Sequence, residues 1–307
     1  MQSRPRILAI RGGAIGDFIL TLPALRLIRD NFANCGVEIL GYPHIAAIAQ
    51  SCGPEPSRTY ADAVHSIEYG PLAGFFARGG SLAPQMCEFF SGYQQVVSWL
   101  FDPDGIFEAN VRRAGVKHYL SAYTKITDDS HAASQLARGL ESLALYLDTP
   151  PAAKLVPSPD LQREADTWLA QHGMDSRFVA IHPGSGSPRK NWPLEKWRTF
   201  AGRLASGKLL VISGEADEHA RGAFPNHPLA HGLPLPLLSA ILARASAYFG
   251  HDTGISHLAA ASGAKCTLLF GPTAPSVWAP LGENVSILEA PAGDLSLLSA
   301  DLLPSPC

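Results

Sequence analysis

The chain has 307 residues, of which 46% are hydrophobic and 17% are charged, and its formal net charge is −3. This length suits two domains, and the composition is that of a globular protein with a sizeable core. The weak negative charge argues against a nucleic-acid partner, and the absence of any run of about 18 apolar residues argues against a membrane span. The five cysteines form no C-x-x-C pair, which argues against a zinc site.

Short apolar segments alternate with helix-like segments along the whole chain. The pattern predicts strands at residues 7–10, 37–41, 96–100, 116–120, 178–182, 209–213, 247–250 and 266–270. It predicts helices at residues 24–32, 133–147, 161–172, 194–205, 237–243 and 256–262. This alternation is typical of α/β proteins, in which parallel sheets are covered by helices on both faces.

Residues 148–159 contain four prolines in twelve positions and are predicted to link two domains. Each side of this segment carries its own strand–helix series, so we predict two doubly wound domains, 1–155 and 156–307. We expect residues 294–303 to form a short helix that packs back on one of them. Ligands of such sheets bind beyond the carboxyl ends of the strands, so the cleft between the two domains is the expected site.

The first candidate motif is residues 11–17, Arg-Gly-Gly-Ala-Ile-Gly-Asp, directly after the first predicted strand. The glycines allow a tight turn that brings Asp17 to the end of that strand. Asp17 is either a functional carboxylate or an ordinary helix cap. Pro23 predicts that the following helix kinks there or restarts, with Thr21 as its cap.

The second motif is residues 182–193, a loop rich in glycine and serine that follows the strand at 178–182. Ser185, Gly186 and Ser187 offer hydroxyls and backbone amides, and Arg189 and Lys190 add positive charge. Together these groups suit a diphosphate, which needs several donors and a cation. The alternative is a solvated basic turn.

The third motif is residues 250–261, where a strand runs through a turn into a helix. Asp252 precedes the helix, and Thr253 and Gly254 are placed for amide contacts with an anion at the positive end of the helix dipole. His257 lies on the first turn of the helix, where it either reaches the ligand or packs in the core.

Three acids follow the strand at 209–213. One of Glu215, Asp217 and Glu218 is a candidate to accept hydrogen bonds from ribose hydroxyls, although an exposed acidic helix start would look the same. Asp102 and Asp104 have the spacing of a divalent-metal pair, but the proline between them is more typical of an ordinary turn.

Five segments occur in an order that resembles glycosyltransferase family 9, the ADP-heptose:lipopolysaccharide heptosyltransferases. They are residues 11–25, 182–187, 190–193, 250–260 and 269–273. The resemblance implies the GT-B architecture, in which two Rossmann-like domains face each other across a cleft. It also implies an inverting glycosyltransferase that needs neither a metal nor a cofactor.

The resemblance also implies roles for individual residues. Asp17 matches the catalytic base and Lys190 matches the lysine that neutralises the nucleotide diphosphate. Asp252, Thr253 and Gly254 match the phosphate-contacting turn. Glu218 fits the ribose-binding acid by its spacing after Gly214. The full predicted binding set is Gly13, Gly16, Ser185, Gly186, Ser187, Lys190, Glu218, Asp252, Thr253, Gly254 and His257.

By the same resemblance, residues 1–155 bind the acceptor, a lipid A–Kdo core in the family, and residues 156–307 bind the donor, ADP-heptose. Residues 98–104 depart from the family because they are acidic where the family is basic, and residues 1–155 hold 14 acidic against 13 basic side chains. The acceptor is therefore left open between a lipopolysaccharide core and another glycan.

Two other functions are compatible with the same motifs: a nucleotide-sugar epimerase or hydrolase, and a non-catalytic nucleotide-sugar-binding protein. The chain starts with a strand-like segment rather than a signal peptide. We therefore expect a cytoplasmic protein that makes at most peripheral contact with the inner face of the inner membrane, through its acceptor.

Overall fold

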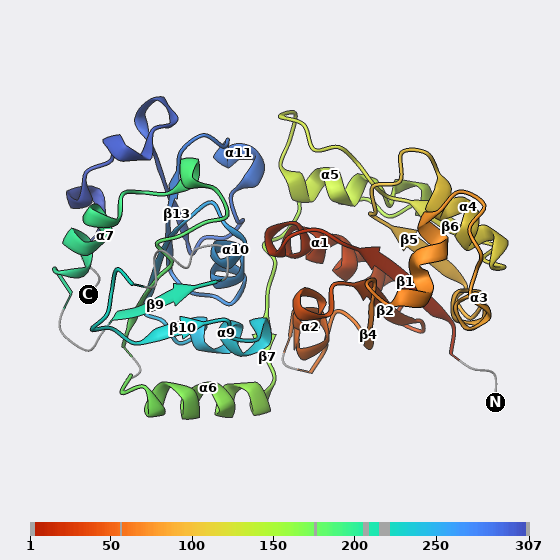
Figure 1. Cartoon of the computed structure of the whole chain (residues 1–307), viewed down its shortest axis with the longest axis horizontal. Helices are drawn as coiled ribbons and strands as arrows, with labels where there is room; N and C mark the ends of the chain where they lie inside the picture. Colours follow the sequence, from red (N-terminus) through yellow and green to blue (C-terminus); the bar gives the residue numbers. More distant parts are fainter. Residues whose placement is uncertain (1–3, 56, 175–176, 205–208, 215–221, 305–307) are drawn as a thin grey trace. The chain divides into compact units, whose positions relative to one another are not determined.

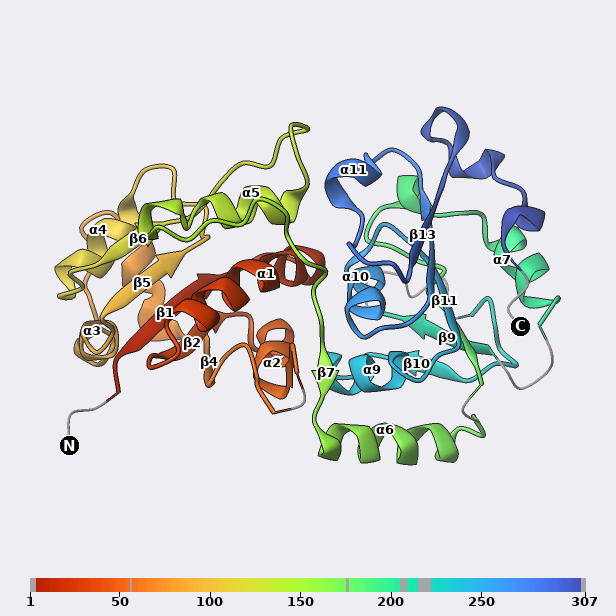
Figure 2. The ribbon, with the colours of Figure 1, turned by 180° about the vertical axis from the view of Figure 1, so that it is seen from behind.

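The computed structural model describes residues 4–55, 57–174, 177–204, 209–214 and 222–304. The chain forms two compact units (Figures 1 and 2). The first unit consists of Met1–Gln50, Arg58–Thr127 and Ala132–Pro150, and the second of Ser51–Ser57, Asp128–His131 and Pro151–Cys307. Within the described residues, every helix is too short or too polar to cross a membrane.

The first unit is built on a parallel sheet with the strand order β4-β2-β1-β5-β6. Its strands are β1 Arg6–Arg11, β2 Gly36–Gly41, β4 Ala63–Ser66, β5 Gln95–Ser98 and β6 Tyr119–Ser121. Its helices are α1 Ile15–Asn31, α2 Pro43–Ser51, α3 Pro84–Ser91, α4 Ile106–Arg113, α5 Ala132–Arg138, η1 Gly70–Phe76 and η2 Glu141–Leu143. Apolar side chains of β1, β2 and β5 are buried because helices cover the sheet, with α1 packed against α5.

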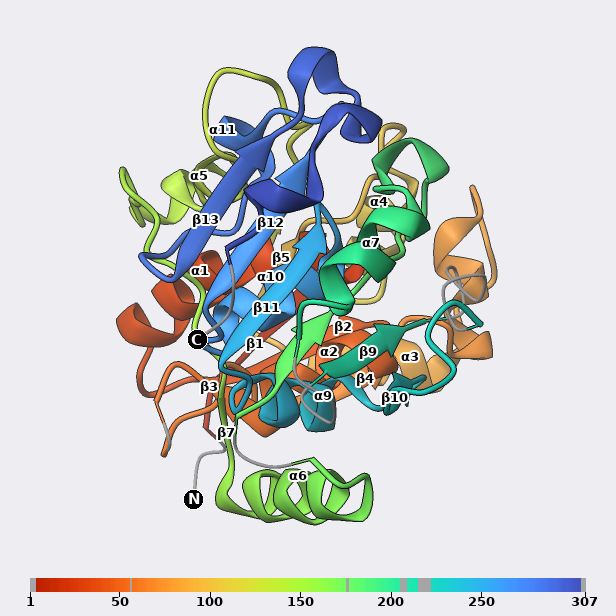
Figure 3. The same ribbon diagram turned by 90° about the vertical axis from the view of Figure 1, so that its left-hand side faces the viewer.

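The second unit is built on a parallel sheet with the order β10-β9-β8-β11-β12-β13, whose strands lie side by side in Figure 3. They are β8 Val179–Ile181, β9 Leu209–Ser213, β10 Leu229–His231, β11 Ala247–His251, β12 Cys266–Phe270 and β13 Val285–Glu289. The short strands β3 Cys52–Gly53 and β7 Val156–Pro157 pair antiparallel.

Helices cover this second sheet as well, and α6 lies beside α9 in both Figure 1 and Figure 2. The helices are α6 Pro159–Gln171, α7 Leu194–Ala201, α9 Leu235–Leu242, α10 Gly254–Ala261 and α11 Pro275–Trp278. Three-residue helical turns are η3 Pro188–Lys190, η5 Pro291–Gly293, η6 Leu295–Leu297 and η7 Ala300–Leu302. The last two, η6 and η7, replace the single helix expected at 294–303, and Leu295, Leu298 and Leu303 pack into the core of this unit.

Two of the predicted helices have different bounds in the structure. The helix α1 begins at Ile15 and runs through Pro23 without restarting. Burial of its apolar residues from Phe18 to Leu25 outweighs the hydrogen bond that proline removes. The helix predicted at 133–147 ends at Arg138. The next residue, Gly139, lies close against Ala122: a Cβ there would lie 2.6 Å from the Ala122 carbonyl oxygen, so the position accommodates only glycine.

A buried polar cluster stabilises the first sheet. The Glu38 carboxylate on β2 accepts hydrogen bonds from the Tyr93 hydroxyl and the His65 imidazole, both at 2.6 Å. Arg6 on β1 lies 3.3 Å from the same carboxylate. Burial alone raises the pKa of Glu38, but the two hydrogen bonds and the positive charge outweigh it, so the pKa lies below its ordinary value.

Replacing Glu38 by glutamine is expected to lower the free energy of unfolding at neutral pH by about 1–3 kcal/mol. Because the folded-state pKa is depressed, this contribution is fully present above the ordinary value of 4.5 and is lost as the pH falls through the folded-state pKa. Urea unfolding between pH 7 and pH 3 should therefore show the two proteins converging. Glu88→Gln, an exposed carboxylate on α3, is the control, and a difference that stays constant with pH would contradict the explanation.

Candidate functional site

The strand order of the second sheet marks where a ligand should bind. The chain passes from β8 outward to β9 and β10 on one side, and from β11 outward to β12 and β13 on the other. The neighbours β8 and β11 therefore form the topological switch point, and ligands of such sheets bind beyond the carboxyl ends of these strands. The loop at 182–193 and the turn at 252–253 both begin there.

The loop after β8 is closed around a buried serine. The Ser185 hydroxyl lies 2.7 Å from the Ser187 carbonyl oxygen and 2.6 Å from Oδ1 of Asn191, and it accepts the Ser187 amide at 3.2 Å. Ser185 thus shapes the loop. Ser187 is half-buried and Gly186 is exposed, and a Cβ at Gly186 would meet nothing within 4 Å. Packing therefore does not require a glycine at position 186.

The turn after β11 presents the N-terminus of α10 at this switch point. Thr253 caps the helix, and its hydroxyl accepts the Ser256 amide at 3.3 Å. His182, the first residue after β8, lies with Nδ1 3.3 Å from the same hydroxyl. The amides of the first helical residues, starting with Gly254, have no acceptor within the helix, and the helix dipole adds partial positive charge. This arrangement is suited to an anion.

A cation stands beside this helix N-terminus. The Lys190 ammonium lies 2.6 Å from Oδ2 of Asp252, and the Thr273 hydroxyl donates to the same oxygen at 2.7 Å. The Asp252 side chain is only 10% exposed and that of Lys190 is 31% exposed. One carboxylate thus fixes the lysine, whose ammonium has further donors for an anion. Thr273 was missed as a site residue, although its position after β12 was a signal.

A buried histidine that the sequence did not single out holds the loop carrying Lys190. Nε2 of His251 accepts the Trp192 amide at 2.9 Å, and the Trp197 ring packs edge-on at 5.4 Å. Trp192 in turn donates its indole N–H to the Leu298 carbonyl at 3.1 Å. These contacts fix the backbone two residues beyond Lys190.

The remaining predicted residues of the second unit divide into two groups. His257 is 4% exposed on the first turn of α10, which favours the packing alternative over ligand contact. Glu215, Asp217 and Glu218 lie outside the described residues, so the ribose-binding acid stays a prediction.

In the first unit, Asp17 lies on the first turn of α1, after β1. Its carboxylate accepts the Ala14 amide at 3.3 Å, so it does cap the helix, yet the side chain remains 43% exposed. Capping and reaction chemistry are therefore compatible at this residue. Gly13 has φ of +95°, and a Cβ there would lie 3.2 Å from the Asp17 carboxylate. Gly16 is half-buried in the same turn of the helix.

A half-buried arginine organises this turn. Arg11 donates to the Thr21 hydroxyl at 3.0 Å and to the Asp17 carbonyl oxygen at 3.1 Å, and it stands 4.0 Å from the Asp17 carboxylate. Burial lowers the pKa of Arg11, while the charge of Asp17 opposes that effect.

The acidic pair after β5 has a structural explanation. Asp102 accepts the Phe107 amide at 3.2 Å and the Glu108 amide at 2.9 Å, one with each carboxylate oxygen. Both oxygens therefore cap α4, as expected for an ordinary turn rather than a metal pair.

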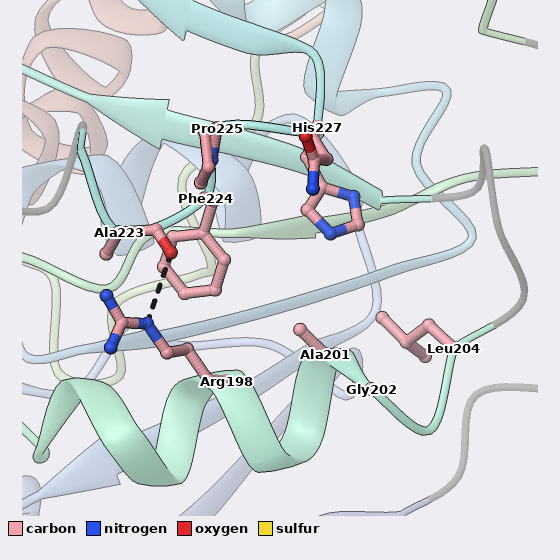
Figure 4. Close-up of a pocket in the computed structure, with 9 residues that line it drawn as sticks. Arg198, Ala201, Gly202, Leu204, Ala223, Phe224, Pro225 and His227 are labelled. Carbon is pink, nitrogen blue, oxygen red and sulfur yellow. Dashed lines mark hydrogen bonds between the residues drawn. The ribbon is translucent and has the colours of Figure 1, made fainter.

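An open pocket of about 370 Å³ lies elsewhere in the second unit (Figure 4). It is lined by the end of α7 with the residues just after it and by the segment 223–227, with Arg198 donating to the Ala223 carbonyl at 3.2 Å. The segment 223–227 leads into β10, so the pocket lies at the end of the parallel sheet where its strands begin. The switch point is at the opposite end.

Comparisons with known proteins agree with this architecture. Lipopolysaccharide heptosyltransferase 1 of Escherichia coli strain RS218 is 29% identical in an alignment 153 positions long that covers 46% of this chain and 47% of that protein. The match thus spans about half the length of that relative. A family 9 glycosyltransferase structure from Veillonella parvula matches with a TM-score of 0.79 at 18% identity, covering 97% of this chain and 94% of that one.

The structure of E. coli heptosyltransferase WaaC with ADP matches with a TM-score of 0.67 at 21% identity, covering 96% of this chain and 97% of that one. These likenesses confirm the predicted fold, two parallel-sheet domains of the GT-B class. The family model of glycosyltransferase family 9 (heptosyltransferase) matches residues 109–296, more than half of the sequence. The chain therefore belongs to glycosyltransferase family 9.

Proposed function

We propose that this protein transfers a heptose, or a related sugar, from an ADP-sugar to a lipopolysaccharide inner core or another glycan, with inversion and without a metal ion. The main observation behind the proposal is that Lys190 lies beside the N-terminus of α10, beyond the carboxyl ends of β8 and β11. A relative of the same fold, E. coli WaaC, has been crystallised with ADP and with an ADP-heptose analogue.

On the donor side, negative charge builds on the diphosphate as its bond to the sugar breaks. Lys190 and the amides near Gly254 are fixed donors that stabilise this charge, and removing one such donor typically costs about 3–4 kcal/mol of barrier. Asp252 holds the lysine in place through their 2.6 Å contact. Because these groups stabilise the negative charge of the departing diphosphate, the proposed transfer needs no divalent cation.

On the acceptor side, Asp17 of the first unit is the proposed general base. The acceptor hydroxyl oxygen attacks the anomeric carbon as the bond to the diphosphate oxygen breaks, and the carboxylate takes the hydroxyl proton. A single displacement of this kind inverts the anomeric configuration. Base catalysis by a positioned carboxylate contributes about 10²–10⁴-fold to the rate.

The proposal is tested by donor binding and by transfer. ADP-heptose and ADP are expected to raise the melting temperature by a few degrees at saturating concentration, and UDP- and GDP-sugars less. Transfer should persist in EDTA. Turnover of ADP-heptose without any acceptor would instead indicate a hydrolase or epimerase, and tight binding without transfer to any glycan would indicate a binding protein.

Replacing Gly13 by alanine is expected to slow transfer about tenfold or more, since the new Cβ would crowd the Asp17 carboxylate at 3.2 Å. It should also cost about 1–2 kcal/mol of stability, because φ is +95°. Gly79→Ala is the matched control: its φ is +66°, and a Cβ there would meet nothing within 4 Å. Transfer kinetics and thermal melts of both variants give the answer. Equal rates for the two would contradict the assignment of Asp17.

A further inference from the structure

The carboxyl edge of the first sheet brings several loops around Asp17. In the order β4-β2-β1-β5-β6, the switch point falls between β1 and β5. A Cβ at Gly12, just after β1, would lie 3.8 Å from the Tyr42 ring and 3.9 Å from a Leu100 methyl. The loops after β1, β2 and β5 therefore meet at the place where a ligand of this sheet is expected.

Two exposed aromatic rings stand at this edge. Phe101 follows β5 and is 66% exposed, the highest value for a large hydrophobic side chain among the described residues. Tyr123 follows β6 and is 41% exposed, and the two ring centroids are 5.1 Å apart. Solvent-exposed aromatic rings near the strand ends where a ligand is expected are typical of an interaction site.

The backbone on both sides of Phe101 is held firmly. Two residues earlier, the buried Trp99 donates its indole N–H to the Leu136 carbonyl at 3.0 Å. The next residue, Asp102, caps α4 with both carboxylate oxygens. The exposed Phe101 ring is therefore held on a fixed loop. A ring held in this way can stack against a ligand with little loss of conformational entropy.

The charges near the two rings disfavour an anionic ligand. The loop after β5 carries Asp102 and Asp104, while the segment after β6 as far as Thr127 carries Lys125. Arg11 is engaged with the Asp17 carbonyl oxygen and the Thr21 hydroxyl. The ligand that suits this edge has an apolar face for the rings and hydroxyls for the carboxylates, which describes an uncharged sugar.

We propose that Phe101 and Tyr123 form a stacking platform for an uncharged pyranose ring, the sugar of the acceptor that receives the transferred group. The inference rests on the proposed function, since it assigns the acceptor of the sugar transfer in which Asp17 is the base. In this proposal the protein recognises the acceptor by stacking against its sugar ring and not by ion pairs with phosphate or carboxylate groups.

Binding tests the platform without turnover. Saturation-transfer NMR with methyl α-D-mannopyranoside as the probe should show ring-proton signals for the unmodified protein and for Phe101→Tyr. The signals should be lost in Phe101→Ala and Tyr123→Ala. Tyr69→Ala is the matched control, because Tyr69 is 52% exposed but follows β4, at the opposite end of the strand order from β6. Equal signals in all variants, or none in the unmodified protein, would overturn the proposal.

Kinetics separate this inference from the proposed function. With ADP-heptose and octyl α-D-mannopyranoside, Phe101→Ala and Tyr123→Ala should raise the acceptor KM about tenfold or more and leave the donor KM and the ADP Kd unchanged. The acceptor KM should not rise with salt. Two results would contradict the stacking platform alone. One is that the protein binds ADP while Phe101→Ala and Tyr123→Ala have the same acceptor KM as Tyr69→Ala. The other is that a lipid A–Kdo acceptor is used with a KM that depends strongly on salt. If the protein does not bind ADP, the proposed function itself fails.

Discussion

Replacing Asp17 by asparagine is expected to lower kcat for sugar transfer by about 10²–10⁴-fold and to leave the ADP dissociation constant unchanged. Asparagine has the same shape, and its amide oxygen can still accept the Ala14 amide that Asp17 accepts at 3.3 Å. The substitution therefore keeps the cap of α1 and removes only the group that takes a proton. Transfer assays and calorimetry with ADP measure the two quantities.

Asp17→Ala is the companion variant. It removes the cap as well as the base, so it should lose about 1 kcal/mol of stability in addition to its activity. If Asp17→Asn kept a rate close to that of the unmodified protein, capping would be the whole role of this residue.

Replacing Lys190 by alanine is expected to weaken ADP binding about 10- to 100-fold, the usual value of a charge-assisted hydrogen bond to phosphate. The same change leaves the Asp252 carboxylate, which is 10% exposed, without its cation and with Thr273 as a remaining donor. A lower melting temperature should therefore accompany the loss of affinity.

Two further variants separate these effects. Lys190→Arg keeps the charge and should retain most of the affinity, although the guanidinium geometry differs. Lys190→Ala combined with Asp252→Asn removes the unpaired carboxylate, so it should recover stability without recovering ADP affinity. Unchanged affinity in Lys190→Ala would contradict a diphosphate role for this lysine.

The central strands of both sheets were predictable, because strands buried on both faces are mostly apolar runs such as Leu209–Ser213 and Cys266–Phe270. The strands β4, β10 and β13 were not. They lie at the sheet edges, β4 and β10 have only four and three residues, and most side chains in these strands are only partly buried. Edge strands of this kind carry a weak apolar pattern, so the sequence offers little signal for them.

The candidate site was predictable as a set of loops but not as a set of contacts. A turn between β11 and α10 follows from local sequence alone, because Thr253 is a good helix cap. The pairing of Lys190 with Asp252 joins residues 62 positions apart, and the strand order that makes them neighbours is a property of the whole sheet. The same holds for His251, whose role depends on the Trp192 amide that folding brings to it.

The most direct measurement is a crystal structure of the protein soaked with ADP. We expect the terminal phosphate within hydrogen-bonding distance of the Lys190 ammonium and of the Gly254 amide, with the nucleotide resting on the edge of the sheet where β8 and β11 end. A nucleotide bound at any other surface, with that helix start and that ammonium untouched, would contradict the account.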